Sequence, residues 1–70
     1  MKRVNVSSSN LATVGYDESS FTLEITFHNG GVYEYYNVPK TTYSGLVSAA
    51  SHGSFFHRHI KDVYGYRKIG

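Results

Sequence analysis

Cysteine and tryptophan are absent from this 70-residue chain, and proline occurs only at Pro39. Without cysteine the chain can form neither a disulfide nor a thiolate metal site. Its apolar runs are far shorter than the roughly 20 residues that a helix needs to cross a bilayer. The charged start MKRVNVSSSN has no apolar stretch behind it, so we expect no signal peptide. These absences favour a cytoplasmic protein that makes no membrane contact.

Aromatic side chains supply much of the apolar material that remains. The chain holds seven tyrosines and four phenylalanines, and each buried ring removes on the order of 150–250 Å² from water. A chain of this length forms one domain, here residues 1–70, and buries only about 60% of its unfolded surface. Its stability therefore depends on how many of these rings enter the core.

Alternation of apolar and polar residues predicts three strands. The clearest is 21–28 (FTLEITFH), in which Phe21 begins a row of four apolar residues that share one face. Residues 11–16 and 32–38 are the other two, and Pro39 ends the last because it cannot donate to a ladder. Segments 2–6 and 64–69 remain candidates for short edge strands.

Two helices are predicted after Pro39. Thr41 or Thr42 would cap the first, which carries an apolar stripe at helical spacing (Tyr43, Leu46, Val47 and Ala50). Gly45 would let this helix pack closely on the sheet. The second would run from Ser51 to about Lys61, with an apolar line of Phe56, Ile60 and Val63 and with Phe55 beside it. Ile69, in the segment that follows, is also expected in the core. The expected fold is α+β: a small antiparallel three-stranded meander, with a short fourth strand left open, and two helices packed on one face.

The turn NGG decides which tyrosines of 32–38 face the core. A two-residue loop would bury Glu34 on the apolar face without a basic partner, which is costly. A three-residue loop over NGG instead pairs Phe27 with Tyr33 and places Tyr35 on the same buried face. Tyr36 then faces solvent and is free to contact a ligand.

The charge is uneven, although the net charge is only +2. Residues 1–57 hold three basic and four acidic side chains, whereas residues 58–70 hold four basic and one acidic. Single-stranded nucleic acid is bound by aromatic platforms beside cations. The predicted contacts are Arg58, Lys61, Arg67 and Lys68 for phosphates, with Tyr64, Tyr66 and Tyr36 for stacking. The competing interpretation is that Tyr64 and Tyr66 seal the core and the charges are only solvated.

Catalytic and metal-binding patterns are weak. His57 and His59 would point about 200° apart on a helix, and no carboxylate cluster completes a set for a metal. The serines lie in no G-x-S-x-G elbow, and the paired glycines have no following helix and lysine to cradle a phosphate. We therefore expect no enzymatic activity, no bound metal and no cofactor.

Several stretches resemble the KTSC domain, a family named for its place at the C-terminus of some lysyl-tRNA synthetases. They are VSSSNLATVGYD, LEITF, GGVYEYYNVP and SHGSFFHRHI, which lie between Val6 and Ile60. The resemblance as a whole covers roughly Val6 to Ile69. Family members also occur as stand-alone proteins in bacteria and phages. The resemblance implies a small binding domain, for which RNA is the usual suggestion.

A protein-interaction or assembly module, of bacterial or phage origin, is the alternative function. A small meander has open edges that can pair with a partner strand or with a second copy, so we expect a monomer or a weak homo-oligomer. The polar sheet face offers a second surface (Thr22, Glu24, Thr26, His28 and Tyr36). Salt dependence separates the two functions, because phosphate binding weakens steeply with salt.

Overall fold

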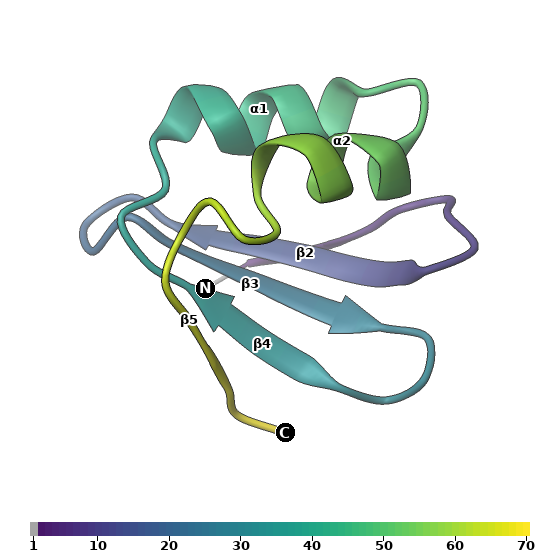
Figure 1. Cartoon of the computed structure of the whole chain (residues 1–70), viewed down its shortest axis with the longest axis horizontal. Coiled ribbons are helices and arrows are strands. Elements are labelled where there is room, and N and C mark those ends of the chain that lie inside the picture. Colours follow the sequence, from purple (N-terminus) through teal and green to yellow (C-terminus); the bar gives the residue numbers. More distant parts are fainter. Residues whose placement is uncertain (1) are drawn as a thin grey trace.

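A computed structural model describes residues 2–70 as a five-stranded antiparallel sheet with two helices on one face (Figure 1). In chain order the elements are β1 (Arg3–Asn5), β2 (Leu11–Asp17), β3 (Thr22–Phe27), β4 (Val32–Tyr35), α1 (Lys40–Ser48), α2 (His52–His59) and β5 (Tyr66–Lys68). The strands lie side by side in this same order. The predicted α+β fold is confirmed, and both candidate edge segments are strands, which makes five strands instead of three or four.

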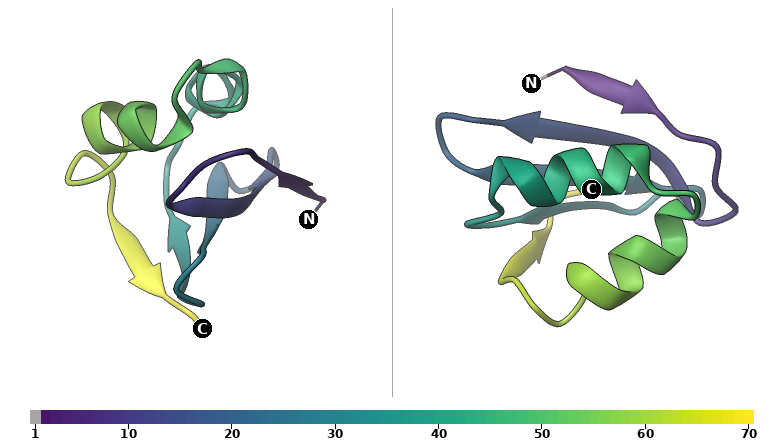
Figure 2. Two further views of the ribbon diagram at one scale, coloured as in Figure 1. Left: turned by 90° about the vertical axis from the view of Figure 1, so that its right-hand side faces the viewer. Right: turned by 90° about the horizontal axis from the view of Figure 1, so that it is seen from above.

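The core lies between the sheet and the helices, and Figure 2 shows that both helices cover the same side. Leu46 is the buried residue of α1, and Phe56 is that of α2. Neighbouring strands align apolar residues beneath them, as Val14 faces Ile25, which in turn faces Tyr33. The buried hydrophobic residues are Leu11, Val14, Leu23, Ile25, Tyr35, Val38, Leu46, Phe56 and Ile60. No helix within residues 2–70 is long and apolar enough to cross a membrane.

The predicted threonine cap of α1 is wrong. The helix begins at Lys40, directly after Pro39, and no side chain caps it. The backbone N–H groups of Thr42 and Tyr43 donate instead to the carbonyl of Pro39, so both candidate threonines already lie inside the helix. The start of α2 follows the expectation more closely, because the Ser51 hydroxyl accepts from the N–H of Ser54.

Gly45 permits close packing between the two helices, not against the sheet as predicted. A Cβ atom at this position would lie 2.8 Å from the tip of the Phe55 ring, closer than such atoms approach in proteins. The ring of Phe55 therefore occupies the space that the missing side chain leaves on α1.

The register of the β3–β4 hairpin differs from the prediction by two residues. Ile25 pairs with Tyr33, and Leu23 pairs with Tyr35. The loop is His28-Asn29-Gly30, since the N–H of Phe27 donates to the carbonyl of Gly31, and Gly30 takes the positive φ of 97°. A shift of two residues preserves the faces, so Tyr33 and Tyr35 still lie on the helix side.

Three residues predicted for the core are exposed. Phe21 (52% exposed) precedes β3 and has a left-handed backbone with φ of 54°. Val63 (60% exposed) lies beyond α2, which ends at His59 and not near Lys61. Ile69 (42% exposed) follows β5, and strand alternation directs it away from the helices.

Candidate nucleic-acid interface

The structure divides the seven predicted contacts among separate places. Lys61, Tyr66 and Lys68 lie at one end of the sheet, on the helix side. Arg67 and Tyr36 lie on the opposite face of the sheet, as the alternation of β4 and β5 requires. The remaining two lie elsewhere: Arg58 is part of α2, and Tyr64 forms a hydrogen bond with Thr42 of α1. The C-terminal charges therefore do not form a single basic patch.

An open pocket of about 300 Å³ lies between the sheet and the end of α2. We call it the aromatic pocket. Its rings come from β3, β4, α2 and β5, and its polar groups come from the β3–β4 loop and the turn after α2. The lining residues are Phe27, Asn29, Tyr33, Tyr35, Phe56, Lys61, Asp62 and Tyr66. Aromatic walls with a few converging polar groups are typical of ligand sites, and this volume is at the small end of their range.

Tyr66 forms the outer wall of the aromatic pocket. Its ring lies 5.6 Å from that of Tyr35 at an angle of 32°, and 5.9 Å from that of Tyr33 at 50°. The side chain is nevertheless 57% exposed. Phe56 closes the inner side, with its ring 5.6 Å from that of Tyr35 in an edge-to-face arrangement. A planar group can therefore reach Tyr66 without displacing the core.

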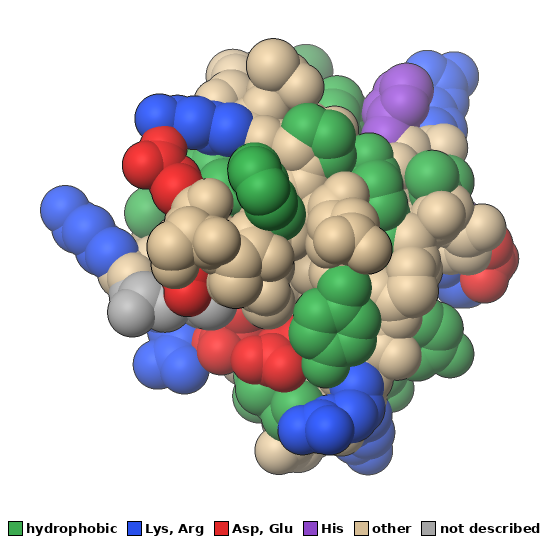
Figure 3. Space-filling model, turned by 90° about the vertical axis from the view of Figure 1, so that its left-hand side faces the viewer, with side chains coloured by type: hydrophobic (Ala, Val, Ile, Leu, Met, Phe, Trp, Pro, Cys, Tyr) green, Lys and Arg blue, Asp and Glu red, His purple; other side chains and the backbone are tan. Residues whose placement is uncertain are grey.

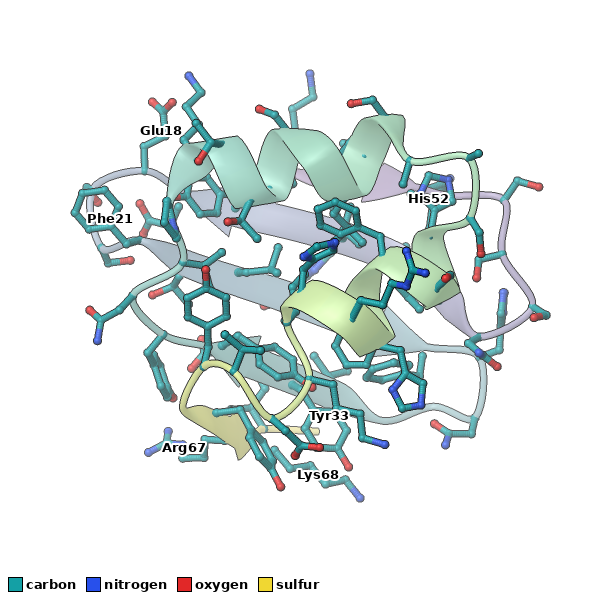
Figure 4. The ribbon with its side chains drawn as sticks, turned by 45° about the horizontal axis from the view of Figure 1, so that its top comes forward. Glu18, Phe21, Tyr33, His52, Arg67 and Lys68 are labelled. Carbon is teal, nitrogen blue, oxygen red and sulfur yellow. The ribbon has the colours of Figure 1, made fainter. Side chains whose placement is uncertain are left out.

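Two lysines lie beside this pocket. Lys61 lines it directly, from the turn that follows α2. Lys68 lies two residues after Tyr66 in β5, so both side chains lie on the same face of the sheet. Lys68 also pairs in register with Tyr33. Figure 4 shows Lys68 close to Tyr33, whereas Arg67 extends to the other side. Both lysines are exposed, so they are available to phosphate groups.

A second hollow of about 330 Å³ adjoins the aromatic pocket, and we call it the polar hollow. The two share four lining residues: Phe27, Asn29, Phe56 and Lys61. The polar hollow adds Asn10, His28 and His57. Together the two hollows form one groove along α2, and Lys61 lies where they meet.

Arg58 lies outside this groove. The prediction placed Arg58 and Lys61 on one helix face, but α2 ends at His59 and the chain turns before Lys61. Arg58 lines a separate shallow hollow with Phe55 and His59. The pairing of Arg58 with Lys61 in one patch is therefore wrong.

Arg67 and Tyr36 lie beside carboxylates on the helix-free face. Glu24 pairs in register with Glu34, and Glu34 pairs with Arg67. Glu24 was expected to face solvent, but it is only 6% exposed and forms an ion pair with Arg3. Tyr36, expected to be exposed, is partly buried and donates to Glu34; burial and this bond raise the pKa of its hydroxyl. The side seen in Figure 3 likewise intermixes acidic and basic groups, which disfavours phosphate there.

Tyr64 is part of the packing. It is partly buried, and its hydroxyl lies 3.3 Å from that of Thr42 on α1 in a hydrogen bond. Tyr64 therefore joins the last segment of the chain to α1 and is not a free stacking platform. No group of three potential metal-ligating side chains occurs among residues 2–70.

Tyr35 gives the aromatic pocket a measurable pH signature. Burial, with smaller effects from Tyr33, Tyr66 and Asp62, raises the pKa of Tyr35 to about 12, from 10 for a free tyrosine. The folded state thus holds this proton more tightly than the unfolded state. Its contribution to stability is complete below pH 10 and is lost as the pH rises towards 12.

We therefore expect the free energy of unfolding to fall between about pH 10 and 12, and Tyr35→Phe to flatten that fall. Urea denaturation across this range, with absorbance titration of tyrosinate, measures both effects. Tyr43→Phe is the control, since Tyr43 also packs against the core from outside the pocket. An equal flattening in both variants would contradict the assignment.

Comparison with known proteins places the chain in a family. The model of the KTSC domain matches residues 7–64. The chain belongs to the KTSC domain family. The crystal structure of a KTSC domain protein from Yersinia pestis superposes with a TM-score of 0.96 at 42% identity, covering 99% of this chain and 97% of that one. The resemblance predicted from the sequence is thus confirmed.

Other members of the KTSC family differ in length. An uncharacterized protein from Stutzerimonas stutzeri is 39% identical over 70 residues, and the match covers 99% of both chains. A lysine–tRNA ligase from Trichormus variabilis is 39% identical over 54 residues, which is 77% of this chain but 10% of the ligase. This chain thus spans only about a tenth of the length of such a ligase. The family match also ends at residue 64, before β5 and its Tyr66, Arg67 and Lys68.

Sequence reasoning predicted two of the eight residues that line the aromatic pocket, Lys61 and Tyr66, and missed the other six. Asn29 was assigned only to a turn, and Asp62 was counted only as a charge that opposes the basic end. The other four were assigned only to the core: Phe27, Tyr33, Tyr35 and Phe56. The hairpin pattern around NGG was a usable signal for Asn29. Nothing in the local sequence indicates that Asp62 lines a pocket. It does so because β5 pairs with β4, which brings Tyr66 into the same pocket as Asp62.

Proposed function

We propose that this KTSC domain is a non-enzymatic module that binds single-stranded RNA in the groove along α2. One base stacks on Tyr66 in the aromatic pocket, and the backbone phosphates lie near Lys61 and Lys68. The observation that carries the proposal is the exposed Tyr66 ring at the wall of an aromatic pocket, with Lys61 and Lys68 beside that pocket. Stacking of a base on such a ring contributes about 1–3 kcal/mol.

Two further observations support a nucleic acid as the ligand. The flanking lysines outnumber the single carboxylate of the pocket, so its surroundings favour an anion. Several relatives with this domain are lysine–tRNA ligases, whose name states tRNA as a substrate. A small accessory module of such a protein would gain from contact with RNA, and the same groove is proposed for this chain.

The test is fluorescence anisotropy with short single-stranded RNA, single-stranded DNA and duplex DNA, at about 50 and 200 mM salt. We expect micromolar binding of single strands that weakens with salt, and about tenfold weaker binding for Lys61→Glu combined with Lys68→Glu. The matched control is Arg58→Glu combined with Lys2→Glu, which makes the same change in charge at exposed sites outside the groove. Absence of binding at about 100 μM in low salt, or an equal loss in the control, would overturn the proposal.

Strand addition at β5 is the second candidate. All three residues of β5 are exposed, and the strand lies at the edge of the sheet with one neighbour, β4. Such an edge can accept a strand from another protein or from a second copy. Backbone pairing of this kind would change little between about 50 and 200 mM salt, so the same titration series separates it from RNA binding.

A further inference from the structure

We infer that the aromatic pocket selects guanine, and that Asp62 is the residue that recognises it. This inference rests on the proposed function, because it concerns which base enters the same pocket. Asp62 is the carboxylate among the residues that line the pocket. The ion pairs within residues 2–70 join Arg3 with Glu24 and Lys40 with Glu18, so the Asp62 carboxylate remains available to a ligand.

The backbone fixes the position of Asp62 in the turn between α2 and β5. The N–H groups of Ile60 and Lys61 both donate to the carbonyl of Phe56, and those of Val63 and Tyr64 donate to the carbonyl of Ile60. Asp62 itself has a φ of 63°, in the left-handed region that aspartate and asparagine adopt more readily than most residues. Ile60 is fully buried, so the turn is anchored in the core.

Asp62 is an exposed residue that lines the pocket together with Tyr35. After burial and the neighbouring rings of Tyr33 and Tyr66, the negative charge of Asp62 further raises the pKa of the Tyr35 hydroxyl. The charge of the Asp62 carboxylate therefore influences the Tyr35 hydroxyl in the pocket. An ionised carboxylate offers acceptors only, so it favours a ligand edge that carries donors.

Guanine is the base whose Watson–Crick edge suits this acceptor. Its N1–H and N2 amino group are adjacent donors, and a carboxylate can accept both at once. Adenine, cytosine and uracil have no two adjacent donors on that edge, so the second carboxylate oxygen would face an acceptor and be repelled. A bidentate contact of this kind discriminates between bases by about 1–3 kcal/mol, which is roughly 5- to 150-fold in affinity.

The test compares pentanucleotides of RNA that differ only in the central base: UUGUU, UUAUU, UUCUU, UUUUU and the inosine analogue UUIUU. We expect UUGUU to bind at least about fivefold more tightly than UUAUU. UUIUU should lie between them, because inosine keeps N1–H but lacks the N2 amino group. In Asp62→Asn the preference for guanine should fall to within about twofold, because the amide replaces one acceptor oxygen with a donor.

Asparagine tolerates the left-handed backbone, so Asp62→Asn is expected to keep the fold, and a thermal melt checks this. Asp17→Asn is the matched control: it makes the same chemical change in a turn-flanking residue outside the groove and should leave the preference unchanged. If no pentanucleotide binds, the proposed function itself fails. If all bind with equal affinity, or if Asp62→Asn keeps the preference for guanine, RNA binding stands and the role of Asp62 is wrong.

Discussion

Truncating Leu46 to alanine is expected to lower the free energy of unfolding by about 2–5 kcal/mol. Leu46 is fully buried and is the buried residue of α1, so its removal leaves a cavity between that helix and the sheet. A domain of this size has a total stability of roughly 4–10 kcal/mol. The variant should therefore be partly or fully unfolded at physiological temperature, which makes this the largest effect that we expect from a single substitution.

Urea denaturation followed by circular dichroism measures this loss. The matched control is Ser44→Ala, two residues earlier in α1, where the side chain is exposed and alanine favours the helix slightly. The control should change stability by less than about 0.5 kcal/mol. A similar small change for Leu46→Ala would mean that α1 is not docked on the sheet as described.

Replacing Tyr66 with alanine is expected to weaken the binding of single-stranded RNA by about 5- to 150-fold. The loss corresponds to the 1–3 kcal/mol that a stacked base contributes. Tyr66→Phe keeps the ring and should retain most of the affinity. The effect should be confined to binding, since Tyr66 is 57% exposed on an edge strand and its truncation opens no buried cavity.

Anisotropy titration at fixed salt measures the effect of Tyr66→Ala, and a melting curve shows whether the fold is intact. The number of phosphate contacts should not change, so the slope of affinity against salt should match that of the unsubstituted protein. Val63→Ala is the control, because Val63 is exposed in the adjacent turn and lines neither hollow of the groove. Equal losses for Val63→Ala and Tyr66→Ala would argue against stacking on Tyr66.

The sequence predicted the faces of the strands better than their ends. Alternation over residues 21–28 identified the helix side of the strand correctly from Leu23 onward, because period two depends only on strand geometry. The opposite face was expected to be wet, but Thr22 and Glu24 on it are buried as well. The prediction failed at Phe21, whose left-handed backbone belongs to the turn and interrupts the alternation. It also missed the register, because two different three-residue loops fit this stretch: Asn29-Gly30-Gly31, which was predicted, and His28-Asn29-Gly30, which is observed. Only the hydrogen bonds of Phe27 distinguish the two.

The candidate site was less predictable than the fold. Tyr66 and Lys61 were expected to contact a ligand and do line one pocket, whereas Arg58 and Arg67 were grouped with them only because they are close in sequence. Spacing along a helix placed Arg58 beside Lys61, but the helix ends between them. The pocket is a tertiary feature that forms when β5 pairs with β4 after two intervening helices. The sequence indicated a short edge strand over 64–69, but not which strand it would pair with.

The position of β5 has a consequence for how such domains diversify. Within residues 2–70 every buried hydrophobic residue lies from Leu11 to Ile60, whereas β5 is wholly exposed and follows the region that matches the family. Substitutions at Tyr66 or Lys68 therefore remove no buried side chain from the core, while they change the outer wall of the pocket or its charged surroundings. Under the proposed function, ligand preference can therefore change through this one strand while the buried core stays the same.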